Sequence, residues 1–237
     1  MLPALSANPV SERNYRVFVR HLLPLAPRPR VLVLGAGDGG KGMGSVLADP
    51  QVDWVESDLV PSRRARFLSD AHRVACSDAS IDGVVAQAVL EHVFDPERAT
   101  AEIRRVLKPG GLLYAETPFM QQVHAGARDF TRFTELGHRR LFRRFEQIDA
   151  GPCCGPGMAL AWSWQGFLLS FSTGSFSRAA LTAAARLSAS WLKVFDRFLL
   201  DRPAARDAAS AFFFLGRKSD STVSDRELLK LYQGAQG

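Results

Sequence analysis

Short runs of apolar residues alternate along the chain with stretches in which apolar residues recur at helical spacing. The first run, Val31–Leu34, has four branched aliphatic residues between a proline at position 29 and a glycine at position 35. Such a run, bounded by residues that break regular structure, is typical of a buried parallel strand. The pattern predicts seven strands, over residues 31–34, 52–56, 66–70, 81–88, 112–116, 145–150 and 211–216.

Helical periodicity is clearest in two stretches. Residues 11–23 place their apolar side chains on one face, and two prolines follow that stretch. Residues 96–107 do the same, and the Lys-Pro-Gly-Gly sequence at 108–111 ends the second helix. Both stretches therefore predict amphipathic helices that pack one face onto the rest of the protein.

A glycine-rich loop follows the first predicted strand. Glycines permit positive φ values and leave no Cβ between the backbone N–H groups and a ligand. Glycines at 35, 37 and 40 fit the dinucleotide-binding pattern, whereas Gly35, Gly37 and Gly39 fit the S-adenosylmethionine-binding pattern. A tight turn without a ligand is the third interpretation, and the loop alone leaves all three open.

Composition and charge are those of a globular protein. The 237 residues are 46% hydrophobic and 23% charged, and the net charge of +6 favours an anionic partner such as nucleic acid, anionic lipid or a phosphorylated substrate. Three cysteines, two of them adjacent, give neither a disulfide framework nor a zinc-ligand spacing, so no metal site is predicted. The first ten residues do not have the pattern of a signal peptide, which favours a cytoplasmic location.

Four segments in the first two thirds of the chain resemble the class I S-adenosylmethionine-dependent methyltransferases, in their broad small-molecule branch. They are Asp-Ala-His at 70–72, Ser-Ile-Asp-Gly-Val-Val at 80–85, Leu-Glu-His-Val at 90–93 and Arg-Val-Leu-Lys-Pro-Gly-Gly at 105–111. The resemblance covers about residues 31–145. It implies a Rossmann-like α/β fold, a seven-stranded sheet with helices on both faces and an antiparallel final hairpin, and a methyltransferase (EC 2.1.1) that uses S-adenosyl-L-methionine.

The resemblance also implies roles for individual residues. Gly35, Gly37 and Gly39 would pass under the methionine and ribose parts of the cofactor, and Asp58 would hold the ribose hydroxyls. The remaining cofactor residues would be Asp70 at the adenine amino group, Ala71 at the adenine ring and Gln87 at the methionine side. The family commonly has an acid two residues before the first glycine, where this chain has Val33. A turn or helix-capping role is the alternative for Asp58.

The loop after the fifth predicted strand carries the candidate catalytic residues. A methyl transfer to oxygen needs a base, and His124 with Asp129 as its orienting partner is the first candidate; Glu116 is weaker. Alternatively, His124 and Asp129 form a hydrogen-bonded pair that shapes the loop, and His92 caps a turn. An arginine run at 139–144 is either a solvated face or a phosphate site.

An insertion separates the sixth and seventh predicted strands. Residues 150–177 carry no charge and hold two tryptophans, and residues 177–200 are amphipathic with basic residues on the polar side. The predicted organisation is a methyltransferase domain over 1–218, with an N-terminal helical segment at 1–30 and the insertion at 151–210, followed by a polar tail at 219–237. The insertion is either a helical cap over the substrate pocket or an interfacial membrane contact.

The sequence therefore favours methyl transfer to a small or lipid- or sugar-linked acceptor, at oxygen. The loop with His124 and Asp129 resembles, more loosely, family members that act on sugars of surface polysaccharides. Nucleic acid is not expected as a partner, and peripheral membrane contact stays open beside the cap. Two alternatives remain: a non-catalytic S-adenosylmethionine-binding or membrane-recruited partner protein, motivated by Val33 and the uncharged insertion, and a nicotinamide oxidoreductase, which rests on the glycine pattern alone. Neither the acceptor nor the oligomeric state can be read from the residues.

Overall fold

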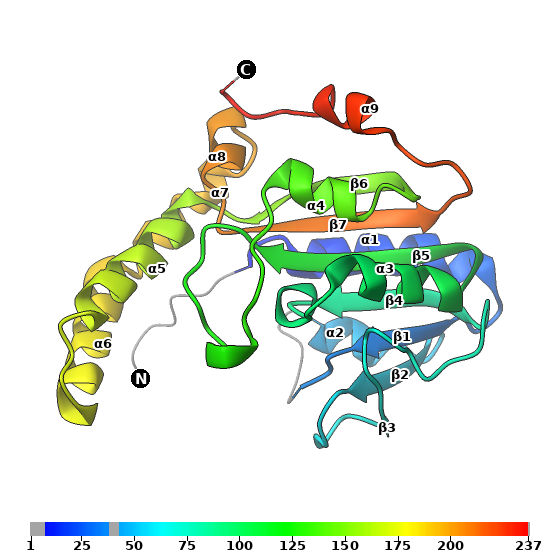
Figure 1. Ribbon diagram of the computed structural model, residues 1–237, viewed down its shortest axis with the longest axis horizontal. Helices are drawn as coiled ribbons and strands as arrows, with labels where there is room; N and C mark the ends of the chain where they lie inside the picture. The colour runs from blue at the N-terminus through cyan, green and yellow to red at the C-terminus, as the bar shows by residue number, and fades with distance from the viewer. Residues whose placement is uncertain (1–7, 38–42, 237) are drawn as a thin grey trace.

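A computed structural model describes residues 8–37 and 43–236 of the chain. Seven strands form one sheet in the order β3-β2-β1-β4-β5-β7-β6 (Figure 1). Strand β7 runs antiparallel to both of its neighbours, and the other pairs are parallel. The predicted fold class is thereby confirmed. The strands are β1 (Arg30–Leu34), β2 (Asp53–Asp58), β3 (Phe67–Leu68), β4 (Ile81–Gln87), β5 (Leu107–Pro118), β6 (Phe145–Cys154) and β7 (Ala211–Lys218).

Helices cover both faces of this sheet, and two of them extend away from it (Figure 1). The helix α1 lies against one face, and α3 and α4 lie on the other. The helices in the described part of the chain are α1 (Ser11–Leu22), α2 (Gly44–Leu47), α3 (Pro96–Val106), α4 (Glu135–Leu141), α5 (Pro156–Leu169), α6 (Ser175–Ala189), α7 (Asp196–Leu199), α8 (Pro203–Asp207) and α9 (Asp225–Leu229).

The core consists of two layers, one on each side of the sheet. Alternate residues of β1 divide between them, because successive side chains of a strand point to opposite faces. Val31 and Val33 join the cluster that contains the apolar face of α1, including Tyr15. Leu32 and Leu34 join the cluster that contains the apolar face of α3. Burial on both faces explains why these strands have continuous apolar runs rather than an alternating pattern.

Several strands differ in length from their predictions; β6, for example, continues to Cys154 instead of ending at residue 150. Strand β3 has only residues Phe67–Leu68, since Asp70 folds back into a turn in which its Oδ1 accepts the N–H of His72 at 2.8 Å. Strand β5 begins at Leu107 instead of Leu112, directly after α3. Gly110 supplies a positive φ of 73° there, and a Cβ on Gly111 would lie 3.0 Å from the carbonyl oxygen of Asp82. The Lys-Pro-Gly-Gly segment is thus part of a strand that begins with an irregular register.

The insertion between β6 and β7 forms a pair of helices that we call the arm (residues 156–199). Helices α5 and α6 pack against each other and project from the body of the protein (Figure 1). The buried carboxylate of Asp196 accepts the backbone N–H groups of Gly155, Gly157 and Met158 at 3.2, 2.8 and 3.0 Å. Asp196 therefore fixes the end of the arm to its beginning, at the point where the arm leaves the sheet.

The C-terminal segment continues from β7 through α9 along the surface. Tyr232 donates its hydroxyl to Asp207 at 2.7 Å, and the Asp207 carboxylate also accepts the N–H of Ala235 at 2.7 Å. These bonds attach the predicted polar tail to α8 at the base of the arm. Within the described residues, no helix has the length and apolar character needed to cross a membrane.

Candidate active site

The carboxyl ends of β1, β2 and β4 meet at one edge of the sheet. Gly35 and Gly37 have φ values of 65° and 53°, and the N–H of Ala36 donates to the carbonyl of Ser57 at 3.0 Å. A Cβ on Gly35 would lie 2.6 Å from Cγ2 of Val89, whereas a Cβ on Gly37 would have no neighbour within 4 Å among the described residues. Gly35 is thus required by packing. Gly39 lies outside the described residues.

Asp58 stands at the end of β2, beside this loop. Its Oδ2 accepts the N–H of Gly37 at 2.8 Å, and its Oδ1 accepts the N–H of Val60 at 3.2 Å. The carboxylate is half-buried and holds the glycine loop directly. The structure therefore brings Asp58 and Gly37 together, as expected for a carboxylate that binds ribose hydroxyls next to a glycine-rich loop.

Replacing Asp58 with alanine should weaken the binding of S-adenosylhomocysteine by about ten- to a hundredfold, because a lost charged hydrogen-bond acceptor costs about 1.5–3 kcal/mol. Asp53→Ala is the matched control, since Asp53 begins the same strand but pairs with the exposed Arg30 at 2.7 Å. Titration calorimetry compares the two variants. An unchanged dissociation constant for Asp58→Ala would remove Asp58 from the site.

Asp70 and Ala71 follow β3 at the same edge. The N–H of Ser69 donates to the carbonyl of Asp58 at 2.8 Å, which places Asp70 beside the end of β2. The carboxylate of Asp70 accepts the backbone N–H of His72, and this bond is the main reason why the pKa of Asp70 is lowered. Ala71 packs half-buried against the core on the α3 side. Both residues line the edge. Within the described residues, neither forms a hydrogen bond or an ion pair with Gly35 or Gly37.

Gln87 belongs to a buried polar network around Glu116. Its amide donates to Oε2 of Glu116 at 2.9 Å, and Asn8 donates to both oxygens of the same carboxylate at 3.0 Å. The hydroxyl of Tyr114 donates to Oε1 at 2.5 Å. Burial raises the pKa of Glu116 despite these donors. The network was not evident from the sequence, because its members are up to 108 positions apart.

Val33 is a core residue in this arrangement. Its side chain is 4% exposed and belongs to the cluster on the α1 side of the sheet. The acid that is common in the family at this position is therefore replaced by an apolar side chain that stabilises the core. Because β1 brings no carboxylate to the edge at this position, the acids there are Asp58 at the end of β2, Asp70 after β3 and Glu116 on β5.

His124 and Asp129 do lie together, in the loop between β5 and α4. Nδ1 of His124 is 3.4 Å from Oδ2 of Asp129, and that oxygen also accepts the backbone N–H of His124 at 2.9 Å. Arg132 makes a two-pronged ion pair with Asp129 and is the main cause of its lowered pKa. Burial lowers the pKa of His124, which favours a neutral ring with Nδ1–H toward Asp129.

The far side of the His124 ring faces two residues from the turn after β4. Nε2 of His124 lies 3.2 Å from Nε2 of His92, and Oε1 of Glu91 lies 3.7 Å from both nitrogens. His92 contacts the carbonyl of Arg128 through Nδ1 at 2.8 Å. Burial raises the pKa of Glu91 to about 8. Glu91 was missed in the sequence, where it is simply the middle residue of a Leu-Glu-His turn.

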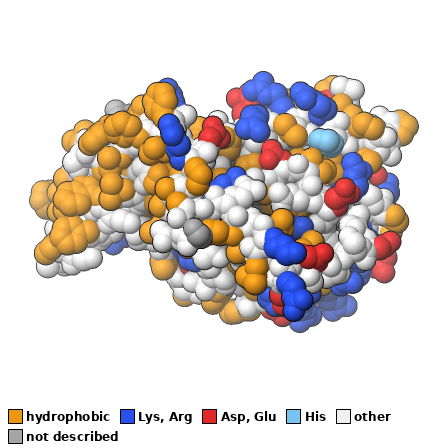
Figure 2. Space-filling model, turned by 90° about the horizontal axis from the view of Figure 1, so that it is seen from above, with side chains coloured by type: hydrophobic (Ala, Val, Ile, Leu, Met, Phe, Trp, Pro, Cys, Tyr) orange, Lys and Arg blue, Asp and Glu red, His pale blue; other side chains and the backbone are white. Residues whose placement is uncertain are grey.

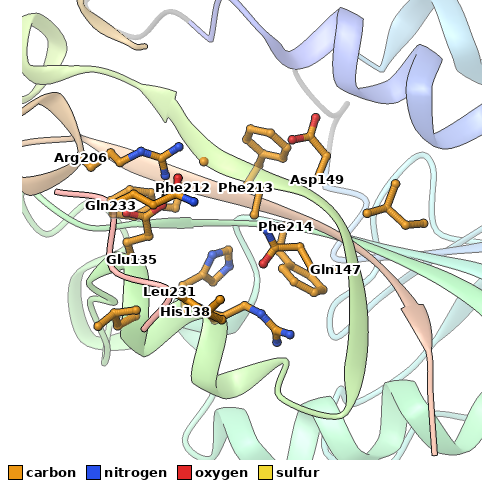
Figure 3. A pocket seen from close by; sticks show the side chains of 15 residues that line it. Glu135, His138, Gln147, Asp149, Arg206, Phe212, Phe213, Phe214, Leu231 and Gln233 are labelled. Carbon is orange, nitrogen blue, oxygen red and sulfur yellow. Dashed lines mark hydrogen bonds and ion pairs between the residues drawn. The ribbon is translucent and has the colours of Figure 1, made fainter. Parts of the chain in front are cut away.

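A cavity of about 270 Å³ lies elsewhere, between α4 and the antiparallel strands β6 and β7 (Figure 3). Glu135 and His138 from α4 and Phe213 from β7 line it. His138 is fully buried, and desolvation lowers its pKa to about 3. Because none of the predicted cofactor or catalytic residues lines this cavity, it is separate from the candidate site.

The residues at the β1–β2–β4 edge fit S-adenosylmethionine. The cofactor needs hydrogen-bond acceptors for its ribose hydroxyls and a backbone that allows close approach. Asp58 provides the carboxylate, and Gly37, which has a positive φ and no Cβ, provides a backbone that a ligand can approach. A nicotinamide dinucleotide would use the same two features, so the geometry of this edge does not separate the two cofactors.

Comparison with known proteins separates them. The methyltransferase-domain family matches residues 43–115. An uncharacterized methyltransferase of Mycobacterium tuberculosis is 41% identical over 103 residues, which cover 39% of this chain and 40% of that protein. A probable S-adenosylmethionine-dependent methyltransferase of the same species is 33% identical over 114 residues, covering 45% and 42%. This chain thus spans less than half the length of the two curated relatives.

Solved structures agree on the fold. A putative sarcosine dimethylglycine methyltransferase from Galdieria sulphuraria superimposes with a TM-score of 0.55 at 16% identity, covering 89% of this chain and 86% of that one. The seven-stranded order with its antiparallel seventh strand is common to both. The expectation of S-adenosyl-L-methionine as the methyl donor is confirmed by these comparisons. Residues 43–115 thus match the methyltransferase-domain family, and the chain has the seven-stranded methyltransferase fold.

Proposed function

We propose that this protein transfers the methyl group of S-adenosylmethionine to an oxygen atom of a small lipid- or sugar-linked acceptor. One observation supports this proposal most: the sheet edge that carries Asp58 and Gly37 also carries the turn with His92, which contacts His124 from the next loop. In open α/β sheets, ligands bind at the carboxyl ends of the strands, so cofactor and acceptor would meet there.

The chain's own residues would mainly orient the reactants and accept a proton. When bound, S-adenosylmethionine supplies an activated methyl group on a positively charged sulfur. Because the leaving group is already activated, the protein contributes alignment and exclusion of water, and a base is needed only to take the proton of a hydroxyl. We assign that proton to Nε2 of His124, whose ring Asp129 and Arg132 hold in place.

The exposed apolar surface of the arm supports the proposal that the acceptor is linked to lipid. Large apolar side chains cover it, and Figure 2 shows them gathered on the projecting part of the molecule. Phe176, Phe198 and Phe171 are 87%, 72% and 65% exposed. An apolar surface of this kind on one projecting element marks an interaction site.

The charge of the arm favours an anionic bilayer surface as its partner. The arm has four basic residues, Arg178, Arg186, Lys193 and Arg197, and its one acid, Asp196, is buried against the start of α5. Exposed aromatic side chains flanked by cations are typical of segments that lie in the membrane interface. Ser163 of α5 accepts a hydrogen bond from Gln122 at 3.1 Å, so the base of the arm contacts the loop that carries His124.

The protein should sediment with vesicles of anionic lipid at low salt and lose that binding as salt increases. Phe171→Ser combined with Phe176→Ser should reduce sedimentation at least tenfold, and Lys193→Glu should reduce it less. Leu229→Ser and Lys230→Glu on the tail are the matched controls and should bind normally. If the arm instead covers the substrate pocket, the wild-type protein will stay in solution and the double variant will lower methyl transfer.

Methyl transfer itself is tested with methyl-labelled S-adenosylmethionine and two acceptor pools, solvent-extracted lipids and a water-soluble extract. The proposal predicts label on an oxygen, in the lipid pool for a lipid-linked acceptor and in the water-soluble pool for a sugar-linked one. The alternative is a non-catalytic S-adenosylmethionine-binding partner protein, which the apolar Val33 favours. In that case the cofactor would bind and neither pool would acquire label.

A further inference from the structure

A three-residue cluster of potential metal ligands lies in the candidate acceptor site. It consists of Glu91 and His92 from the turn after β4 and His124 from the loop after β5. One ligand atom from each residue lies within 4.8 Å of the other two. We propose that Glu91, His92 and His124 bind a divalent transition-metal ion, with Zn²⁺ as the reference ion and with a further coordination position open to the acceptor.

The spacing of the ligand atoms fits coordination. The two Nε2 atoms are 3.2 Å apart, and Oε1 of Glu91 is 3.7 Å from each. Zinc binds imidazole nitrogen at about 2.0–2.1 Å, and in tetrahedral geometry two such ligands are then about 3.3 Å apart. A shift of a few tenths of an ångström in the Glu91 carboxylate would complete a three-ligand site.

The hydrogen bonds of the two rings leave the facing nitrogens available. Nδ1 of His92 contacts the carbonyl of Arg128 at 2.8 Å, and a carbonyl can only accept, so Nδ1 carries the proton. Nδ1 of His124 is next to the carboxylate of Asp129, which likewise accepts. Each Nε2 therefore has its lone pair directed at the other ring. Partners of this kind, behind metal-binding histidines, are the usual outer shell of a metal site.

Glu91 gives an independent indication of a ligand. Its side chain is fully buried, and neither carboxylate oxygen has a hydrogen-bond partner among residues 8–37 and 43–236. A buried carboxylate without partners is costly, and a cation between it and the two histidines would satisfy it. The backbone around it is fixed, because the N–H groups of Phe130 and Thr131 both donate to the carbonyl of Glu91 at 2.9 and 3.2 Å.

An ion could enter from solvent and leave room for a substrate. The side chains of His92 and His124 are 24% and 25% exposed, whereas Glu91 forms the buried floor of the cluster. Two histidines and one carboxylate leave a coordination position open, as in catalytic rather than structural zinc sites. This ligand set differs from the sequence expectation of no metal site, because His92 and His124 are 32 positions apart and no short motif connects them.

The role of the ion rests on the proposed function. An acceptor hydroxyl bound to the ion would have a lowered pKa and would give its proton to solvent water more readily before the oxygen attacks the methyl carbon and the sulfur leaves as a neutral thioether. His124 would then serve as a ligand, because its Nε2 lone pair is used in coordination, and the base role would apply to the metal-free protein. Binding of the ion can be measured without methyl donor or acceptor, so the proposed metal site can be tested independently of methyl transfer.

The test is titration calorimetry of the chelator-treated full chain with Zn²⁺ alone. We expect one ion per chain, and we expect Glu91→Gln and His124→Gln to weaken binding by more than about a hundredfold. Asp129→Asn should weaken it by about ten- to a hundredfold as an outer-shell partner. His21→Ala on α1 and Cys76→Ser remove other potential ligands outside the cluster and should bind normally. S-adenosylhomocysteine binding in each variant verifies the fold.

A second readout identifies the ligands. Co²⁺ in place of Zn²⁺ should give the visible absorption of a low-coordinate site with nitrogen ligands, and that absorption should be absent in His92→Gln. Zinc binding that survives in Glu91→Gln and His124→Gln, or no saturable binding to the wild-type chain, would overturn the proposal. In the second case the two Nε2 atoms share a proton instead of a metal ion.

Discussion

Gly35→Ala is expected to abolish measurable cofactor binding and to lower the stability of the protein. The residue has a φ of 65°, and the new Cβ would lie 2.6 Å from Cγ2 of Val89 at the end of β4. The left-handed conformation costs about 1–2 kcal/mol for a non-glycine residue. Forced overpacking adds about 1–3 kcal/mol. Because the carboxyl ends of β1 and β4 would have to separate, the loop that holds Gly37 against Asp58 would be displaced.

Gly37→Ala is the matched control for this variant. Gly37 has a similar φ of 53°, but a Cβ there has no neighbour within 4 Å among the described residues. Its stability loss should therefore be limited to the conformational cost of about 1–2 kcal/mol. Thermal unfolding and calorimetry with S-adenosylhomocysteine distinguish the variants. Equal unfolding temperatures for Gly35→Ala and Gly37→Ala would show that the contact with Val89 does not determine the shape of the loop.

His124→Ala should lower the turnover number by about a hundred- to ten-thousandfold, the range observed when a positioned acid–base group is removed. The dissociation constant for S-adenosylmethionine should stay the same, because within the described residues no hydrogen bond or ion pair joins His124 to Gly35, Gly37 or Asp58. The measurement is single-turnover methyl transfer with saturating cofactor. A loss of cofactor binding together with turnover would indicate that His124 only shapes the loop.

His92→Ala distinguishes the two roles of the His124 ring. If His124 acts as a base without metal, His92 is a neighbour at 3.2 Å and its loss should have the smaller effect on turnover. If both are metal ligands, the two variants should lose activity to a similar extent, and added Zn²⁺ should restore neither. His21→Ala serves as the control for the loss of a histidine, because His21 is in the last turn of α1 and outside the cluster.

Much of the fold could be predicted because it depends on local pattern. The apolar runs Val31–Leu34 and Ile81–Gln87 are buried on both faces, and two-sided burial produces an uninterrupted apolar run that is visible in the sequence. The extension of β5 back to Leu107 was not visible, since it passes through Pro109, Gly110 and Gly111, which normally end regular structure. Pairing with β4 overrides that local preference.

The candidate site was predictable only in part. Gly35, Gly37 and Asp58 follow their strands directly, so strand prediction places them at one edge. Glu91 and the partners of Glu116 depend on contacts between segments far apart in the chain, such as Asn8 with Glu116. Their side chains have no local periodicity or motif that marks them. Burial without a hydrogen-bond partner, which identifies Glu91, is a property of the folded protein alone.

For the arm, too, sequence pattern predicted helical structure but not which of its side chains are exposed. The amphipathic pattern of residues 177–200 predicted a helix, and α6 covers the first half of that range. The uncharged stretch before it forms α5. The direction in which they leave the sheet depends on Asp196, which bonds to three backbone N–H groups about 40 positions earlier. Sequence pattern therefore identified the apolar residues of the arm, and only the fold showed that so many of them face outward.

Calorimetry of the full chain with S-adenosylmethionine, S-adenosylhomocysteine and NAD tests whether the glycine loop and Asp58 bind S-adenosylmethionine. We expect saturable binding of both adenosyl compounds at one per chain, lost in Gly35→Ala, and no binding of NAD. Binding of NAD without either adenosyl compound would contradict this expectation and would assign the glycine loop of residues 35–37 and the carboxylate of Asp58 to a nicotinamide cofactor.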